Sequence, residues 1–158
     1  MSPMGAIEST TLGLAMRQST WLYPIVEIAH IAGLAILVGS IAVLDLRLLG
    51  FSRGLPVRKL ASHTLPWTLG SFLLILPSGF MMFVAHAGDL IANPVFALKI
   101  CLVLAAGTNA ALFHASVFRG AAAWDVDAMP PLAARASAAL SLLLWLSVIA
   151  CGRLLAYT

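Results

Sequence analysis

The stretch VEIAHIAGLAILVGSIAVLDLRLL, residues 26–49, decides the fold of this chain. It places Glu27 and His30 one helical turn apart and then runs apolar for about four turns before Asp45 and Arg47. A membrane crossing needs about 20 mainly apolar residues. In hydrocarbon, a backbone must satisfy its own hydrogen bonds, and a helix does so within one segment. The stretch therefore predicts a transmembrane helix.

The composition extends this prediction to the whole chain. Of 158 residues, 61% are hydrophobic and 9% are charged, whereas a soluble domain is about half apolar and a quarter charged. We predict an all-α integral membrane four-helix bundle, a single transmembrane domain over residues 1–158. The four spans are expected at 21–48, 64–86, 94–117 and 134–156, joined by connectors rich in Gly, Pro and charge. A short amphipathic helix at the interface is expected before the first span.

The basic residues predict the orientation in the membrane. Six lie near the connectors between spans one and two and between spans three and four, whereas three lie toward the other side. Cytoplasmic segments carry the excess of Lys and Arg, so both termini are expected outside the cytoplasm. The net charge of +3 is too small to indicate a nucleic-acid partner. The six residues are Arg47, Arg53, Arg58, Lys59, Arg119 and Arg135, and the three are Arg17, Lys99 and Arg153.

Ionisable groups inside the spans are the candidate functional residues. Each costs about 2.5–3.5 kcal/mol on insertion scales, so each is a functional hypothesis. Glu27, His30 and Asp45 fall on one stripe of the first helix, which is expected to face inward. Depth sorts the groups into two layers. The outer layer holds Glu27, His30, His86, Lys99 and Arg153, and the inner layer holds Asp45, His63, His114, Arg119 and Arg135.

Two histidines per layer, with cations beside them, favour b-type haem. Such a haem needs two imidazoles on opposite faces of the iron and basic groups for its propionates. His30 and His86 are expected to hold an outer haem, with Lys99 or Arg153 at the propionates. The predicted inner haem uses His63 and His114, with Arg135 or Arg119. A single haem in either layer is the alternative, and Glu27 and Asp45 are expected to hydrogen-bond the ligands or to handle protons.

Copper is the alternative metal, because His and Met side chains are copper ligands. His30, Met82 and His86 would form that site. Proton or ion translocation would use Glu27, His30, Asp45 and Lys99, but the sequence marks no continuous path. A di-iron site needs a second Glu-x-x-His pair, and the only other glutamate is Glu8. The sequence leaves open whether the protein is an enzyme.

Four stretches carry a recognisable pattern: residues 18–50 (QSTWLYPIVEIAHIAGLAILVGSIAVLDLRLLG), 65–80 (LPWTLGSFLLILPSGF), 93–99 (NPVFALK) and 139–157 (ALSLLLWLSVIACGRLLAY). Through them the chain resembles an uncharacterised family of small four-helix bacterial inner-membrane proteins, a domain of unknown function. The resemblance implies the bacterial inner membrane and four spans, and no established activity. At a coarser level the architecture is similar to b561-type cytochromes and to the membrane domain of CopD-type copper-resistance proteins.

These observations lead to one leading functional prediction and two alternatives. The leading prediction is a membrane b-type haem protein for electron transfer, linked to quinone and a periplasmic redox partner or acting as the membrane subunit of a larger complex. The first alternative is a copper-binding or copper-transporting protein. The second is a non-catalytic anchor or assembly subunit whose polar residues join helices by hydrogen bonds.

Overall fold

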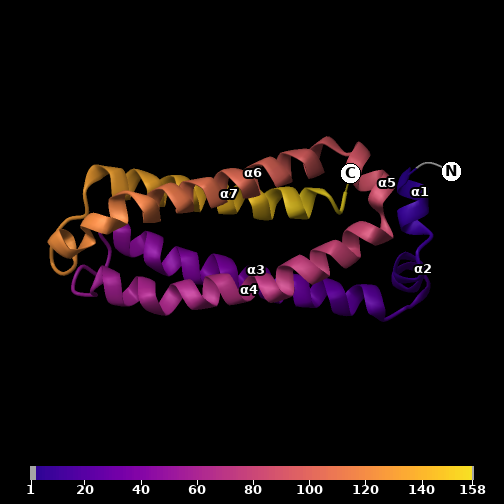
Figure 1. The fold of residues 1–158 in the computed structure, drawn as a ribbon, viewed down its shortest axis with the longest axis horizontal. Helices are drawn as coiled ribbons and strands as arrows, with labels where there is room; N and C mark the ends of the chain where they lie inside the picture. The colour runs from indigo at the N-terminus through magenta and orange to yellow at the C-terminus, as the bar shows by residue number, and fades with distance from the viewer. Residues whose placement is uncertain (1–2, 158) are drawn as a thin grey trace.

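The computed structural model describes residues 3–157, and these residues fold into helices without any β-strand. Four helices are long and apolar enough to cross a membrane: α3 (Leu22–Leu48), α4 (Val57–Ala85), α6 (Pro94–Ala115) and α7 (Leu132–Leu154). Figure 1 shows them side by side along one long axis. The prediction of an all-α protein with four apolar spans is confirmed.

Three of the four predicted spans agree with the helix bounds to within two residues. The exception is α4, which begins at Val57, whereas residue 64 was predicted as its first. Asp125, in the connector between α6 and α7, caps the start of α4. The Arg58 amide donates to Oδ1 of Asp125 at 2.8 Å, and the Val57 amide donates to the Asp125 carbonyl at 3.1 Å. The helix also continues through Pro66 and Pro77.

The long helices form two hairpins. Helix α3 packs along α4 and α6 packs along α7, while α3 also contacts α7 (Figure 1). In the part of the chain that the structure describes, the backbones of α4 and α6 do not pack directly on each other. Long side chains bridge that gap, and the rings of Phe83 and Phe96 stack with their centroids 5.9 Å apart. The two hairpins are therefore closer along α3 and α7 than along α4 and α6.

Gly33 allows the first hairpin to pack closely. A Cβ atom built on Gly33 would lie 2.8 Å from Cγ1 of Ile75 and 3.0 Å from Cβ of Leu74, both on α4. These distances are shorter than carbon atoms tolerate, so α3 and α4 approach each other as they do because residue 33 has no side chain.

Both ends of the described chain lie at one end of the molecule, here called the terminal end (Figure 1). This end carries α1 (Pro3–Glu8), α2 (Thr11–Gln18) and α5 (Ala87–Ala92). One amphipathic helix was predicted before the first span, and the structure has two. The Thr10 side chain joins them, because its hydroxyl donates to the Ile7 carbonyl of α1 at 2.7 Å and accepts a hydrogen bond from the Gly13 amide of α2 at 3.3 Å.

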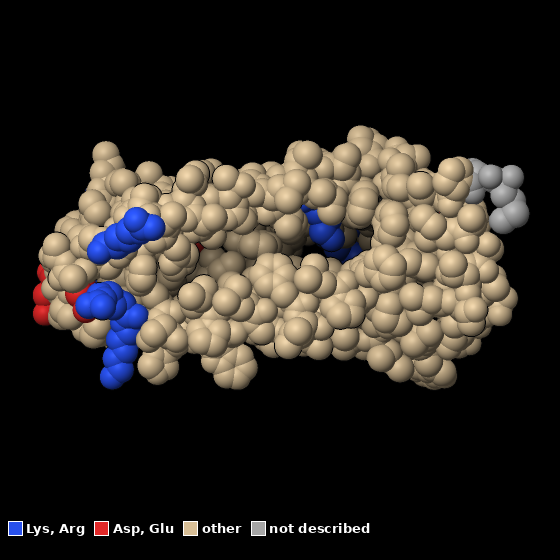
Figure 2. Space-filling view, viewed as in Figure 1, with Lys and Arg blue, Asp and Glu red and all other residues tan. Residues whose placement is uncertain are grey.

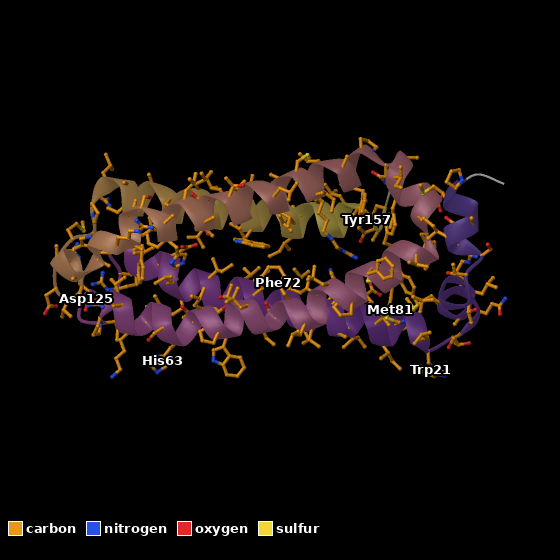
Figure 3. The ribbon with its side chains drawn as sticks, in the orientation of Figure 1. Trp21, His63, Phe72, Met81, Asp125 and Tyr157 are labelled. Carbon is orange, nitrogen blue, oxygen red and sulfur yellow. The ribbon has the colours of Figure 1, made fainter. Side chains whose placement is uncertain are left out.

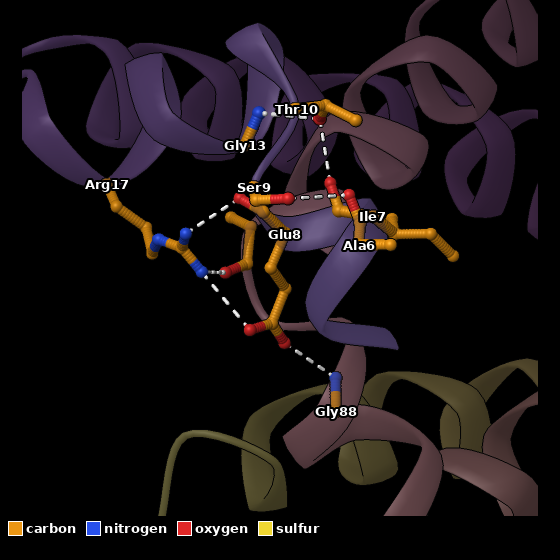
Figure 4. Close-up of polar contacts among 9 residues, drawn as sticks. Ala6, Ile7, Glu8, Ser9, Thr10, Gly13, Arg17 and Gly88 are labelled. Atoms are coloured by element: carbon orange, nitrogen blue, oxygen red, sulfur yellow. Dashed lines mark hydrogen bonds and ion pairs between the residues drawn. The ribbon is translucent and has the colours of Figure 1, made fainter. Parts of the chain in front are cut away.

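Glu8 and Arg17 join these short helices to the bundle (Figure 4). Nη1 of Arg17 lies 3.3 Å from Oε2 of Glu8 and donates to the Ala85 carbonyl at 3.2 Å. Oε1 of Glu8 accepts from the Gly88 amide at 2.7 Å. The short helices therefore close over the junction between α4 and α5.

The opposite end, here called the loop end, holds the α3–α4 connector and the 3-10 helix η1 (Val117–Trp124). Arg47 is only 1% exposed there. Its Nε donates to the Leu55 carbonyl at 2.7 Å, and its Nη2 donates to the carbonyls of Arg53 at 3.0 Å and Asp125 at 3.1 Å. Arg47 thus ties the two inter-helix connectors together.

Candidate functional site

A cavity of about 310 Å³ lies between the two hairpins toward the loop end. All four long helices contribute to its mainly apolar lining, and Phe72 points into the space between the hairpins (Figure 3). On the side of the terminal end, the cavity is followed by a core cluster of Leu37, Ala106, Trp145 and Val148. The polar residues of the lining are Ser40, Asp45, Thr64, Thr68, Asn109, His114, Ser137 and Ser141.

Most of these polar side chains are paired with each other or with the backbone. Nδ2 of Asn109 donates to the Ser137 carbonyl at 3.0 Å, and the Ser137 hydroxyl donates to Oδ1 of Asn109 at 3.1 Å, which joins α6 to α7. The hydroxyls of Ser40 and Thr68 lie 2.8 Å apart and join α3 to α4. Such hydrogen bonds hold helices together within each hairpin and satisfy the groups that make them.

Asp45 is a buried residue of the cavity lining whose side chain is only partly hydrogen-bonded. Its side chain is 6% exposed, faces Ser141 of α7, and has no hydrogen-bond partner for Oδ2 in the described structure. The one ion pair among the described residues is that of Glu8 with Arg17, at the far end of the bundle. Buried polar atoms are normally satisfied, and an unsatisfied one costs about 1–3 kcal/mol. Asp45 therefore offers an open hydrogen-bonding position to a ligand.

His114 is the second open group of the cavity. The ring is half-buried on α6 and packs edge-on against Phe113 and Phe118, with centroid distances of 5.2 and 5.1 Å. Within residues 3–157, no hydrogen bond to either ring nitrogen is formed. The cavity thus contains one carboxyl group and one imidazole that are free to exchange protons with a bound molecule.

His30 occupies a different level, near the terminal end. Its Nδ1 lies 3.0 Å from the Ser78 hydroxyl of α4. That hydroxyl shares its hydrogen between the carbonyls of Leu74 and Ile75. Ser78 has one hydrogen to donate, so Nδ1 of His30 is the donor to Ser78. Nε2 of the neutral ring then carries the free lone pair, which is the form that binds a metal.

The predicted outer pair, His30 and His86, does not converge on one point. His86 ends α4, where its ring meets Tyr23 edge-on at a centroid distance of 5.5 Å. Ser78, which contacts His30, lies eight residues or about 12 Å of helical rise before His86. Met82 lies between the two levels and packs with Val26 and Met16. The predicted copper ligands are therefore spread over successive turns.

The predicted inner pair, His63 and His114, is also not brought together. His63 is exposed, its Nδ1 lies 2.8 Å from the Lys59 carbonyl, and its side chain points away from the bundle (Figure 3). Periodicity did not indicate this facing. No group of three or more His, Cys, Asp or Glu side chains in residues 3–157 is placed to hold a metal ion.

The remaining candidate residues have separate locations. Lys99 is half-buried on α6, and Arg135 is half-buried with its Nε unpartnered, whereas Arg119 and Arg153 are exposed. Arg153 stacks on the Tyr157 ring with its Cζ 4.7 Å from the centroid. The prediction that Glu27 faces inward is wrong, because Glu27 is exposed on the second turn of α3. A carboxylate so near a helix start can reach water and head groups, and that removes the cost of burial.

A family profile matches residues 6–158 of the chain. The protein belongs to DUF6644, a family of unknown function. This confirms the expectation of an uncharacterised family that covers nearly the whole chain. Neither the curated proteins nor the solved structures contain a match to this member of DUF6644. The coarser similarity to b561-type cytochromes and CopD-type proteins thus gains no support from the comparisons.

Proposed function

We propose that the cavity binds a lipid-soluble molecule of the quinone class and that the protein serves membrane electron transport. One observation carries the proposal: the cavity between the four spans is lined by a buried carboxyl oxygen without a partner, on Asp45, and by the unpartnered imidazole of His114. A carboxylate accepts a hydrogen bond from a quinol hydroxyl, and a carboxylic acid donates one to a quinone carbonyl. The volume of about 310 Å³ falls at the lower end of small-molecule sites.

The arrangement of the hairpins supports entry from the bilayer. The cavity lies between α4 and α6, whose backbones do not pack on each other in the described structure. Figure 2 shows the molecular surface hollowed along the space between the hairpins. A hydrophobic molecule dissolved in lipid therefore reaches the cavity sideways, without crossing water.

The residues of this chain supply the proton chemistry of such a site. Oxidation of a quinol to a quinone releases two protons and two electrons. Asp45 and His114 are the two proton acceptors that line the cavity. The electrons pass to a redox partner, which is a larger membrane complex or a haem group.

Trp145 provides a direct test because it lines the cavity and is 7% exposed. Decylubiquinone added to protein in nanodiscs is expected to quench the tryptophan fluorescence with a saturable dependence on concentration. Trp145→Phe should remove the saturable component. The matched control is Trp67→Phe, because Trp67 is 67% exposed on α4 and does not line the cavity. Quenching that rises linearly and is lost equally in both variants would show partition into lipid alone and contradict the proposal.

A b-type haem held by His30 is the second candidate, favoured by the free Nε2 that the Ser78 contact leaves. Of these two histidines, His30 alone would hold such a haem, since His86 lies about two turns away. A bound haem would supply one-electron transfer. Protein purified in mild detergent and reduced with dithionite should then show a high-spin spectrum that His30→Ala abolishes. A sharp low-spin α-band would contradict single ligation, and a colourless preparation from haem-replete cells would exclude the candidate.

We further propose that the protein lies in the bacterial inner membrane with its loop end in the cytoplasm. Lys, Arg, Asp and Glu side chains gather at the loop end (Figure 2). The excess of basic residues near the connectors, six against three, supports this orientation. Alkaline phosphatase fused after residue 158 should be active and green fluorescent protein fused there should be dark. The reverse result would invert the topology.

A further inference from the structure

Lys99 is an unpaired cation within a membrane-spanning helix. It is half-buried on α6, and it forms neither a hydrogen bond nor an ion pair with any described residue. The ionisable group of α3 that interacts with it is His30, which is basic as well. Charged groups in membrane segments normally pair with a partner of opposite sign. Among residues 3–157, Lys99 forms no ion pair with a carboxylate, and the group of α7 that interacts with it is the Cys151 thiol.

The space around the Lys99 ammonium is kept open by small residues. A Cβ atom built on Gly152 of α7 would lie 3.7 Å from Nζ of Lys99, so the ammonium lies over a glycine. Across the space, His30 lies against Gly79 of α4, where an added Cβ atom would be 3.1 Å from its Cε1. Figure 2 shows Lys or Arg atoms inside a hollow between the hairpins, away from the charged loop end. The hollow thus exposes positive charge to whatever enters it.

The position of Lys99 along α6 and the route into the hollow indicate which kind of molecule binds there. Lys99 is the sixth residue of α6, about 8 Å of helical rise from the first. A lysine side chain at that depth can extend its ammonium toward the lipid head groups. Toward the terminal end, the rings of Phe83 on α4 and Phe96 on α6 stack across the gap. Entry is therefore sideways, from the bilayer between α4 and α6.

We propose that this half of the hollow is a binding site for an anionic phospholipid, with Lys99 contacting the lipid phosphate and an acyl chain lying in the apolar gap between α4 and α6. Basic pockets between transmembrane helices bind anionic head groups in this way. The site is separate from the cavity of Asp45, because the apolar cluster around Leu37, Trp145 and Val148 lies between them.

Phosphatidylglycerol is the probe, with phosphatidylcholine as the lipid of no net charge. Native mass spectrometry of the purified protein should show phosphatidylglycerol retained in preference to phosphatidylcholine, and phosphatidylglycerol should raise the Tm in detergent more than phosphatidylcholine does. Lys99→Gln should weaken phosphatidylglycerol binding about fivefold and remove the Tm difference. Lys99→Arg should keep both. Lys59→Gln is the matched control, because Lys59 is exposed at the loop end and should leave both unchanged.

Gly152→Val keeps the charge but fills the space beside Nζ, so it should also lower phosphatidylglycerol binding. Equal retention of the two lipids by the wild type would overturn the proposal even if no variant folded. An equal Tm shift with inorganic phosphate would show a site for free anions and would also overturn it. If Lys99→Gln changed haem content and left lipid preference intact, Lys99 would serve a haem propionate instead. The quinone measurement with Trp145 is unaffected by any of these results.

Discussion

Among the described residues, the two halves of the space between the hairpins differ in the ionisable side chain of their lining that forms no ion pair. Near the terminal end, the unpaired group is the Lys99 ammonium, which faces His30. Near the loop end, it is the carboxyl group of Asp45, in a cavity with His114. An apolar cluster that includes Leu37 lies between the two halves. The comparison favours two separate binding sites for different ligands, an anionic lipid and a neutral quinone, over one polar path across the membrane.

The strongest test of this separation is at Arg47. We expect Arg47→Met to lower the free energy of unfolding by about 3 kcal/mol, because three carbonyl groups lose a charged donor in a buried connector. Quinone binding near the loop end should fall, whereas the lipid preference at Lys99 should persist. Unfolding by SDS titration, with both binding assays, measures this. Arg53→Met, at an exposed residue, is the control and should change little.

Gly33 tests the packing on which both halves depend. Gly33→Ala should destabilise the protein by about 1–3 kcal/mol, because the new Cβ would lie 2.8 Å from a side-chain carbon of Ile75. Gly39→Ala is a matched control on the same helix, since a Cβ at residue 39 meets no atom within 4 Å. It should be neutral or slightly stabilising. Equal losses in the two variants would show that close approach of α3 and α4 does not determine stability.

Asp45→Leu should affect function and stability in opposite directions. Decylubiquinone affinity, measured by quenching of Trp145, should fall about tenfold with the loss of a hydrogen bond to a carboxyl group. The Tm should rise, because an unsatisfied buried oxygen is replaced by apolar atoms. Asp89→Leu, at an exposed residue of α5, is the control and should leave quinone binding unchanged. A lower Tm with unchanged binding would mean that Asp45 stabilises the fold.

The smallest effect is expected at the terminal end. Arg17→Gln removes the ion pair with Glu8 and the contact with the Ala85 carbonyl, and it should cost about 1 kcal/mol because these side chains are partly exposed. The loss should show as faster proteolysis before residue 20, while quinone binding near the loop end stays unchanged. A change in quinone affinity would indicate that the two halves are coupled.

Sequence alone predicted the spans because hydropathy depends on local composition, and three of the four helices begin and end near the predicted residues. It missed the start of α4 because the capping residue, Asp125, lies 67 residues from Arg58. It grouped His63 with His114 by depth, but depth does not give helix rotation, and His63 faces away from the bundle. Arg47 was read as an orientation signal, although it is buried and holds the connectors.

The contacts of Glu8 also bear on the order in which the protein assembles. The carboxylate accepts from the amide of Gly88, 80 residues later in the chain. This contact forms only after α3 and α4 have been synthesised and inserted. Until then, α1 and α2 lack their hydrogen bond to the start of α5. The first turn of α4 is completed later still, because the Asp125 carboxylate that accepts from the Arg58 amide lies beyond α6. The terminal end of α4 can therefore be completed before its loop end.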